Sequence, residues 1–281
     1  MNAEYFFITC KSVLSQSKLP GLKYSLNPYR GCEHGCIYCY VPSLMRDKEL
    51  TETWGKSVWR KLNLVDVLAK EVKKKPRGIV GVSTVCDPYQ PIEADDKLTR
   101  RCIQILADNG FHVSIHTKSS LVLRDADIIA PEKFDVGTTI TTMDRGLAAL
   151  LEPGAATPAA RAKVLEEFSA RGVETWLFLG PIIPFVNDSE DSLKQVIEVA
   201  ARTKSKLIYD KFNVNKWALE QLKNAFETER SDLVGQLPCL VRDSSELWQS
   251  TVAKINEICR DLRVNSEAAF PTWPDRATEA C

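Results

Sequence analysis

Short runs of apolar and β-branched residues recur along the chain and alternate with stretches in which apolar residues repeat every three or four positions. The first pattern is typical of strands, and the second is typical of amphipathic helices. Strands that alternate with helices indicate βα units and a parallel sheet. The predicted strands cover residues 22–27, 79–84, 112–117, 136–141, 174–179 and 207–209.

Four helical stretches among these strands carry their apolar residues on one face. Their apolar positions are Leu64, Leu68 and Val72, then Leu98, Cys102 and Ile105, then Val164, Leu165 and Phe168, and then Leu193, Val196, Ile197 and Ala200. Two helix starts are well marked, because Thr157 precedes Pro158 as an N-cap and residues 187–189 (Asn-Asp-Ser) precede the fourth stretch. After Asn215 we predict helices, the last over residues 247–262, and no further strand.

These elements predict an α/β fold, namely an open partial TIM barrel with a (βα)6 core, because six strands are fewer than the eight of a closed barrel. We divide the chain into an N-terminal segment (1–21), the core (22–215) and a C-terminal helical extension with a tail (216–281). Ligands of such sheets bind at the carboxyl ends of the strands. The residues that directly follow each strand are therefore the candidates for function.

Charge and composition narrow the class of protein. The 37 Lys and Arg residues balance the 37 Asp and Glu residues, so no overall field attracts the chain to nucleic acid. No apolar run approaches the roughly 18 residues that cross a bilayer, and the first residues lack the basic segment and cleavage site of a secretion signal. We therefore expect a cytoplasmic protein. The nine cysteines, an odd number, indicate metal or redox chemistry more than a disulfide framework.

Three of the nine cysteines, Cys32, Cys36 and Cys39, form a C-x3-C-x2-C array in a loop that contains glycine and follows the first predicted strand. Three thiolates can bind three irons of a [4Fe–4S] cluster and leave the fourth iron open. A structural zinc site is the alternative, but it needs a fourth ligand. His34 lies within the loop, and the sequence contains no second pair of Cys or His residues at the spacing that zinc sites use. The loop is too polar for cysteines that merely pack in a core.

The array, with Tyr38 as the aromatic residue before the third cysteine, resembles the signature of radical S-adenosylmethionine (SAM) enzymes. Together with residues 27–40, the segment 83–93 (Ser-Thr-Val-Cys-Asp-Pro-Tyr-Gln-Pro-Ile-Glu) resembles the branch that contains spore photoproduct lyase and photolyase-like DNA repair proteins. The resemblance spans about residues 22–215. It implies a [4Fe–4S] cluster, SAM as second cofactor, and an electron donor such as flavodoxin or ferredoxin.

The resemblance also implies roles for single residues. Tyr38 is expected near the SAM adenine, and Lys118 is expected to meet the SAM carboxylate, although a Lys at this position could equally face solvent. Thr139 and Thr141 alternate along the fourth strand, where their hydroxyls could reach SAM or serve as ordinary β-formers. Asp144 is a candidate for the SAM ribose or the substrate, and a helix N-cap is its other interpretation.

Three functions remain open. The first is a radical SAM enzyme that acts on DNA or a nucleotide-derived lesion, the second modifies a peptide or a small metabolite, and the third is a metal-binding module without catalysis. Cys86 follows the second strand and is a candidate hydrogen-atom donor, although free cysteines often pack as small apolar residues. The lyase's donor cysteine aligns near Thr84 and not on Cys86, which argues against activity on spore photoproduct.

Overall fold

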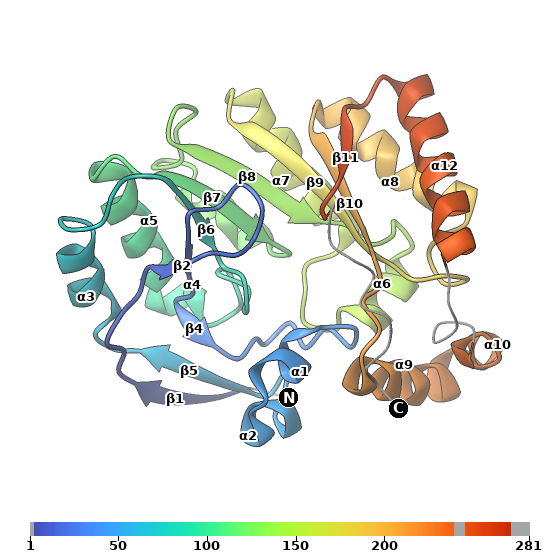
Figure 1. The fold of residues 1–281 in the computed structure, drawn as a ribbon, viewed down its shortest axis with the longest axis horizontal. Coiled ribbons are helices and arrows are strands. Elements are labelled where there is room, and N and C mark those ends of the chain that lie inside the picture. The colour runs from blue at the N-terminus through green and yellow to red at the C-terminus, as the bar shows by residue number, and fades with distance from the viewer. Residues whose placement is uncertain (1–2, 239–244, 271–281) are drawn as a thin grey trace.

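The computed structural model describes residues 3–238 and 245–270 and contains one large, open sheet. Its strand order is β11-β10-β9-β8-β7-β6-β3-β2 (Figure 1). Seven strands of this sheet pair in parallel. Six of them correspond to the six predicted runs, so the open partial TIM barrel is confirmed. They are β3 (Tyr24–Leu26), β6 (Ile79–Val82), β7 (His112–Thr117), β8 (Phe134–Thr139), β9 (Glu174–Ile182) and β10 (Lys206–Lys211).

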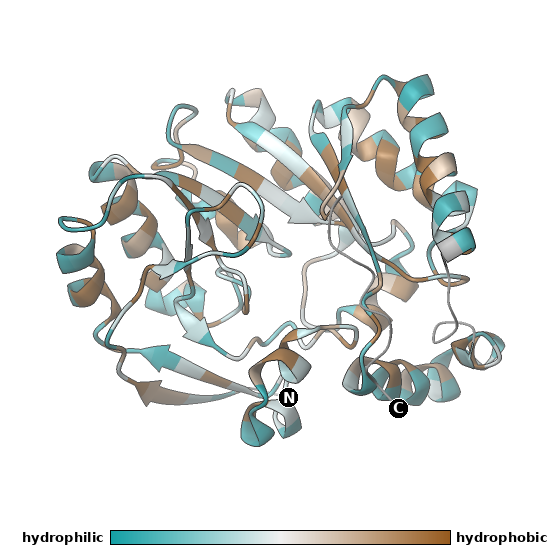
Figure 2. Ribbon diagram, in the orientation of Figure 1, coloured by the Kyte–Doolittle hydropathy of each residue, from teal (hydrophilic) through white to brown (hydrophobic). Residues whose placement is uncertain are grey.

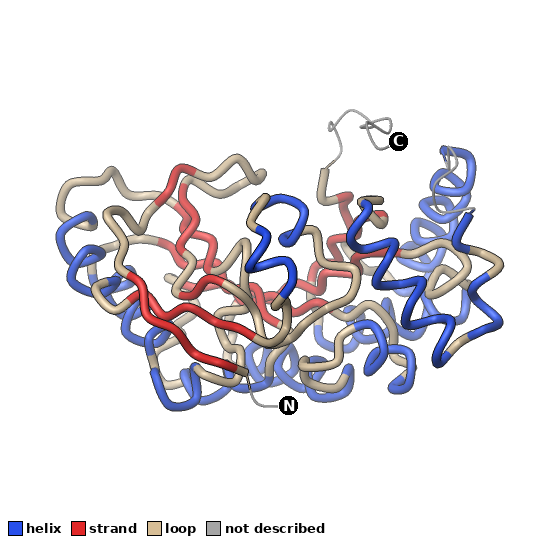
Figure 3. Tube along the Cα trace, turned by 90° about the horizontal axis from the view of Figure 1, so that it is seen from below, coloured by secondary structure: helices blue, strands red, loops and turns tan. Residues whose placement is uncertain are grey.

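The long helices cover one face of this sheet, as the side view shows (Figure 3). They bury the apolar residues of strands in which polar and apolar residues alternate. In β7, for example, Val113 and Ile115 are inaccessible to solvent. Figure 2 shows the resulting bands of polar and apolar residues along the central strands. The predicted N-cap Thr157 accepts a hydrogen bond from the Ala160 N–H. The covering helices are α3 (Leu64–Glu71), α5 (Leu98–Asp108), α7 (Pro158–Ala170), α8 (Glu190–Thr203) and α12 (Ser245–Leu262).

The opposite face of the sheet carries polar side chains that bind one another. Asp135 on β8 accepts hydrogen bonds from the Ser114 hydroxyl (2.6 Å) and the Trp176 indole N–H (2.7 Å). Its second oxygen lies 2.8 Å from Nε2 of His112. Burial of the carboxylate is therefore compensated by three partners from neighbouring strands. This face belongs to the inside of the open barrel.

A second, three-stranded sheet was not predicted from the sequence. It consists of β1 (Glu4–Ile8), β5 (Ser57–Lys61) and β4 (Tyr29–Arg30), in the order β1-β5-β4. Phe6 pairs with Trp59, and their rings stack with centroids 5.4 Å apart. Two short helices, α1 (Val41–Met45) and α2 (Lys48–Glu52), lie beside this sheet (Figure 1).

The C-terminal part corrects one prediction. Residues beyond Asn215 do contain another strand, β11 (Ser266–Ala268), which pairs in parallel with β10. Its residues are not strong β-formers, so their pairing depends on the strand already present. The predicted division into three segments stays a prediction, and the tail after residue 270 lies outside the described residues. The remaining elements are β2 (Ser15–Gln16), α4 (Glu93–Asp96), a 3-10 helix (Ser120–Asp125), α6 (Arg145–Leu151), α9 (Lys216–Glu229) and α10 (Ser231–Val234).

Candidate cluster and cofactor site

The three clustered cysteines lie in the loop between β4 and α1, which we call the cysteine loop (residues 31–40). Cys32 and Cys36 are buried, Cys39 is half-buried, and all three are free thiols. The backbone N–H of Asp87 points at Cys32 Sγ across 3.4 Å. Burial raises the pKa of Cys39, whereas backbone N–H groups at the start of α1 lower it. Backbone donors therefore face two of the sulfurs, as thiolate ligands of a metal cluster require.

The three clustered thiols are a donor set that a [4Fe–4S] cluster takes. Among residues 3–238 and 245–270, no three His, Cys, Asp or Glu side chains are spaced to hold one metal ion. In a [4Fe–4S] cluster each thiolate binds a different iron, so the sulfurs stand farther apart than around one ion. His34, the fourth ligand that zinc would need, is buried with Nδ1 3.3 Å from the carboxylate of Asp87.

Asp87 connects the cysteine loop with the segments that follow β6 and β7. Its Oδ1 accepts hydrogen bonds from the Thr117 hydroxyl (2.7 Å) and the Tyr89 N–H (2.9 Å), and its Oδ2 accepts one from the Lys118 N–H (2.7 Å). Burial raises the pKa of this carboxyl, but the neighbouring His34 and these hydrogen bonds outweigh burial and hold its pKa well below the usual range. Asp87 is therefore an ionised, buried anchor beside the cysteine loop.

Lys118 is half-buried and lies beside the cysteine loop. Its Nζ is 5.9 Å from the centroid of the Tyr38 ring. Burial lowers the pKa of Lys118, and the nearby Cys36 and Glu152 more than offset that effect, so the ammonium group stays charged. Conversely, Lys118 lowers the pKa of Cys36 and of Cys39, which burial raises. The structure thus brings Tyr38, Lys118 and the cysteines into one site.

The other three candidates for SAM binding are Thr139, Thr141 and Asp144. Thr139 ends β8, and its hydroxyl lies 2.8 Å from Nε2 of His116. Thr141 lies beyond the end of β8, and its buried hydroxyl has no hydrogen-bond partner among the described residues. Asp144 is the N-cap of α6, where Oδ1 accepts from the Gly146 and Leu147 N–H groups. Their roles at a cofactor stay predictions.

Cys86 is half-buried at the carboxyl end of β6 and packs against the main core. Its thiol contacts the Tyr29 carbonyl oxygen (3.4 Å) and the Ser83 hydroxyl (3.5 Å). Burial raises the pKa of Cys86 to about 11. The group is therefore a thiol at neutral pH, which suits a hydrogen-atom donor better than a nucleophile.

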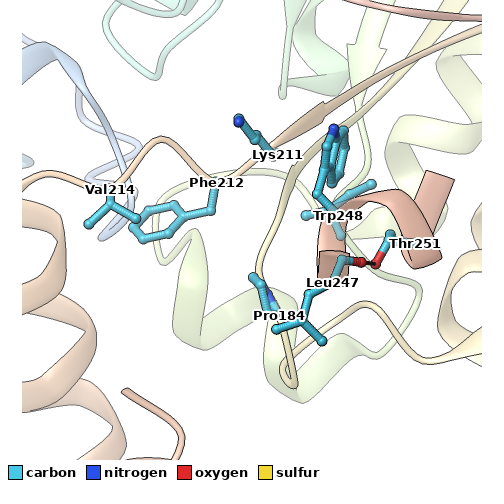
Figure 4. Close-up of a pocket in the computed structure, with 8 residues that line it drawn as sticks. Pro184, Lys211, Phe212, Val214, Leu247, Trp248 and Thr251 are labelled. Atoms are coloured by element: carbon cyan, nitrogen blue, oxygen red, sulfur yellow. Dashed lines mark hydrogen bonds between the residues drawn. The ribbon is translucent and has the colours of Figure 1, made fainter. Parts of the chain in front are cut away.

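A cavity also opens at the carboxyl ends of β9 and β10, against the first turns of α12 (Figure 4). Its volume of about 30 Å³ holds little more than water. Phe212 and Trp248 make its wall largely apolar, and Figure 4 shows Leu247 and Thr251 of α12 on the same side as Trp248. In this shape the cavity is too small for a substrate.

Two further residues of this site, Glu152 and Arg161, could not be recognised from the sequence. Arg161 lies on α7, in a stretch that reads as an ordinary amphipathic helix, yet its side chain is 1% exposed. It pairs with Glu152, which in turn accepts a hydrogen bond from the Tyr38 hydroxyl. Only the folded chain brings these three residues together.

The fold and the cysteine site define a class of protein. The chain belongs to the radical SAM superfamily, whose family model matches residues 26–197, and it is an enzyme of that superfamily. Superfamily members use SAM with an iron–sulfur cluster and need an electron donor. No helix within residues 3–238 and 245–270 has the length and apolar character to span a bilayer.

Two uncharacterised proteins are similar to this chain in sequence. An uncharacterised protein of Methanocaldococcus jannaschii is 35% identical over 188 residues, which cover 66% of this chain and 71% of that protein. An uncharacterised protein of Mycobacterium tuberculosis is 31% identical over 207 residues, which cover 69% of this chain and 61% of that protein. The chain therefore spans about three fifths of the mycobacterial relative.

Solved structures confirm the resemblance at the level of the fold. Spore photoproduct lyase complexed with dinucleoside spore photoproduct aligns with a TM-score of 0.70 and 16% identity, over 95% of this chain and 82% of the lyase. A radical SAM methyltransferase from Sphaerobacter thermophilus aligns with a TM-score of 0.56 and 13% identity, over 89% of this chain and 66% of that chain.

Proposed function

We propose that the chain holds a [4Fe–4S] cluster through Cys32, Cys36 and Cys39 and binds SAM beside it. When bound, the cluster supplies the electron that cleaves SAM to methionine and a 5′-deoxyadenosyl radical, which abstracts hydrogen from a substrate. The observation that carries this proposal is the set of three clustered thiols with backbone N–H donors at two sulfurs and a charged Lys118 nearby.

The chain's own residues bind and orient SAM in this proposal. The Lys118 ammonium group forms a charge-assisted contact with the SAM carboxylate, and the Tyr38 ring packs beside the adenine. The hydroxyl of Thr141 supports a role in binding the ribose or methionine part, because it is buried without a partner among the described residues. Thr139 and Asp144 are secondary candidates, since each already makes a hydrogen bond within the protein.

For the substrate we favour DNA or a nucleotide-derived lesion, because the spore photoproduct lyase that shares this fold is complexed with a dinucleoside lesion. The net charge of zero predicts weak nonspecific binding to DNA. The second candidate is a small metabolite or a peptide, which the fold shared with a radical SAM methyltransferase supports. Flavodoxin or ferredoxin is the proposed electron donor.

The proposed function is tested by its products. Anaerobically reconstituted protein, given dithionite and SAM, should release methionine and 5′-deoxyadenosine even without substrate, as measured by mass spectrometry. The Lys118→Ala variant should keep its iron yet bind SAM about tenfold or more weakly, because a charge-assisted contact is lost. A wild type with a full cluster that leaves SAM intact would contradict the proposal. Unchanged SAM affinity in the variant would remove only Lys118 from the site.

We further propose that Cys86 returns a hydrogen atom to the substrate or product radical. Support comes from its place at the carboxyl end of β6 and from its protonated thiol. The Cys86→Ala variant should keep the cluster and cleave SAM, but form less normal product and more misrouted radical products, as seen by mass spectrometry once a substrate is known. Cys102→Ala, which removes a thiol from the core, is the control. A normal product yield from Cys86→Ala would leave Cys86 with a packing role.

A further inference from the structure

The segment that joins α6 to α7 contacts the cysteine loop through its backbone. The Leu151 carbonyl accepts a hydrogen bond from the Ile37 N–H (3.0 Å), and the Gly154 N–H donates to the His34 carbonyl (2.9 Å). The approach is so close that a Cβ atom on Gly154 would lie 2.3 Å from the Glu33 carbonyl oxygen. The two segments, more than a hundred residues apart in the chain, are therefore held as one unit.

A buried ion pair lies at the centre of this contact. Arg161 Nη2 lies 2.5 Å from Glu152 Oε2, and the two side chains are 1% and 0% exposed. Glu152 Oε1 accepts the hydrogen bond from the Tyr38 hydroxyl. Arg161 also donates to the carbonyl oxygens of Ala156 (2.7 Å) and Thr139 (3.0 Å). The pair thus connects the cysteine loop, the end of β8 and the start of α7.

Stability alone is a weak reason for such a pair. Two charges removed from water cost as much as their attraction returns, and apolar replacements of buried ion pairs are often neutral or stabilising. A pair of this kind can instead impose one geometry on its neighbours. Here the neighbour is Tyr38, which lies between two of the clustered cysteines and is itself buried. Its hydroxyl direction is set by Glu152, and Glu152 is in turn fixed by Arg161.

The pair also acts on the cluster site through its charges. Glu152 contacts Tyr38, which lies between Cys36 and Cys39 in the chain, and Arg161 contacts Glu152. Both charges are buried beside the cysteine loop, where they are shielded little by water. With both present their effects largely cancel, whereas removal of either one leaves a net charge beside Cys36.

We propose that the Glu152–Arg161 pair is a positioning device that fixes Tyr38, and with it the Cys36-to-Cys39 turn, in the geometry that receives SAM. Neither residue touches the cofactor, so both act through Tyr38 and through their field at the cluster. The inference rests on the proposed function, because Tyr38 is taken to contact SAM. It adds two residues, the C-cap of α6 and one from α7, that determine how tightly SAM is bound.

The test uses the anaerobically reconstituted protein and four variants: Glu152→Gln, Arg161→Gln, the double variant and Tyr38→Phe. All four should retain iron and bind SAM about threefold to tenfold more weakly, as expected for lost hydrogen bonds near the ligand. Glu152→Gln leaves a positive charge and should raise the reduction potential of the cluster. Arg161→Gln leaves a negative charge and should lower it, and the double variant should return it close to the wild-type value. Potentials are measured by redox titration followed with electron paramagnetic resonance.

Arg124→Gln is the matched control, because it disrupts another buried ionic group, in which Arg124 binds Glu93 and Asp125. It should lose thermal stability and keep wild-type SAM affinity and potential. Wild-type potentials and SAM affinities in Glu152→Gln and Arg161→Gln would overturn the positioning role. If those variants do not fold, wild-type SAM affinity in Tyr38→Phe would overturn it as well. A wild-type holoprotein that binds no SAM would overturn the proposed function itself, whereas the previous outcomes leave that function intact.

Discussion

Replacement of Cys32, Cys36 or Cys39 by Ala should abolish the [4Fe–4S] cluster and reduce SAM cleavage to an undetectable level. Each thiolate is expected to hold a separate iron, and the described residues offer no spare thiol in the loop that could take its place. The measurements are iron and sulfide per chain, the visible absorbance of the anaerobic protein, and the yield of 5′-deoxyadenosine.

A control variant, Cys102→Ala, distinguishes the effect of losing a cluster ligand from the effect of losing any buried cysteine. Cys102 is fully buried on α5, away from the cysteine loop, so Cys102→Ala should cost stability but keep full iron. Full iron and sulfide in all three loop variants would contradict the cluster assignment. Stoichiometric zinc in the anaerobically purified wild type would do the same.

Asp87→Ala should be among the most destabilising substitutions in the chain, by about 3 to 5 kcal/mol in the free energy of unfolding. The change leaves the Thr117 hydroxyl and the N–H groups of Tyr89 and Lys118 without their acceptor in a buried site. Urea denaturation of the protein without its cluster measures the effect. Asp127→Ala, which removes an exposed carboxylate paired with Arg100, should change stability little. A similar loss in both variants would contradict the anchoring role of Asp87.

The effect should also depend on pH. The pKa of Asp87 in the folded protein lies below its ordinary value of 3.8, so the carboxylate contributes stability above about pH 4. That contribution decreases as the pH falls below 3.8, because the unfolded chain then takes up a proton that the folded carboxylate does not, and it is lost once the folded carboxyl is protonated too. The difference in unfolding free energy between wild type and Asp87→Ala should therefore narrow at low pH. A constant difference from pH 7 down to pH 3 would show that Asp87 acts by packing and not by charge.

Most of the large sheet could be predicted because six of its seven parallel strands carry their own local signal. Residues 112–117 alternate in polarity, and β7 has these same bounds. The strand that begins at Glu174 extends to Ile182, three residues past its predicted end, since Gly180 and Pro181 read as a loop. Local patterns thus locate the strands, whereas their ends depend on the neighbouring strand.

The small sheet could not be predicted, for two physical reasons. Residues 4–8 contain four consecutive apolar residues with no alternation, so they read as a patch. Residues 57–61 combine Trp59 with Arg60 and Lys61 and read as a basic surface. The two segments are joined only by pairing across about fifty residues, which leaves no trace in either segment alone.

The candidate site divides in the same way. The cysteines are recognisable because a metal cluster requires ligands at short spacing, which is a local property of the sequence. Asp87 and Glu152 depend on partners that lie far away along the chain, and Arg161 depends on Glu152 in the preceding segment. Each of the three has a common surface interpretation by itself. Asp144 shows the converse, because its local signal as an N-cap is what the structure displays.

The large sheet of the open barrel has two edge strands, and both are very short. On one side β2 contains two residues, and on the other β11 contains three. A longer margin would expose a row of unpaired backbone groups able to recruit a strand from a neighbouring molecule. The barrel can thus remain open for its ligands without becoming a template for fibril growth. The edge strand β1 of the small sheet is aromatic and has five residues, so it is not protected by shortness. Self-association at high concentration should therefore begin there.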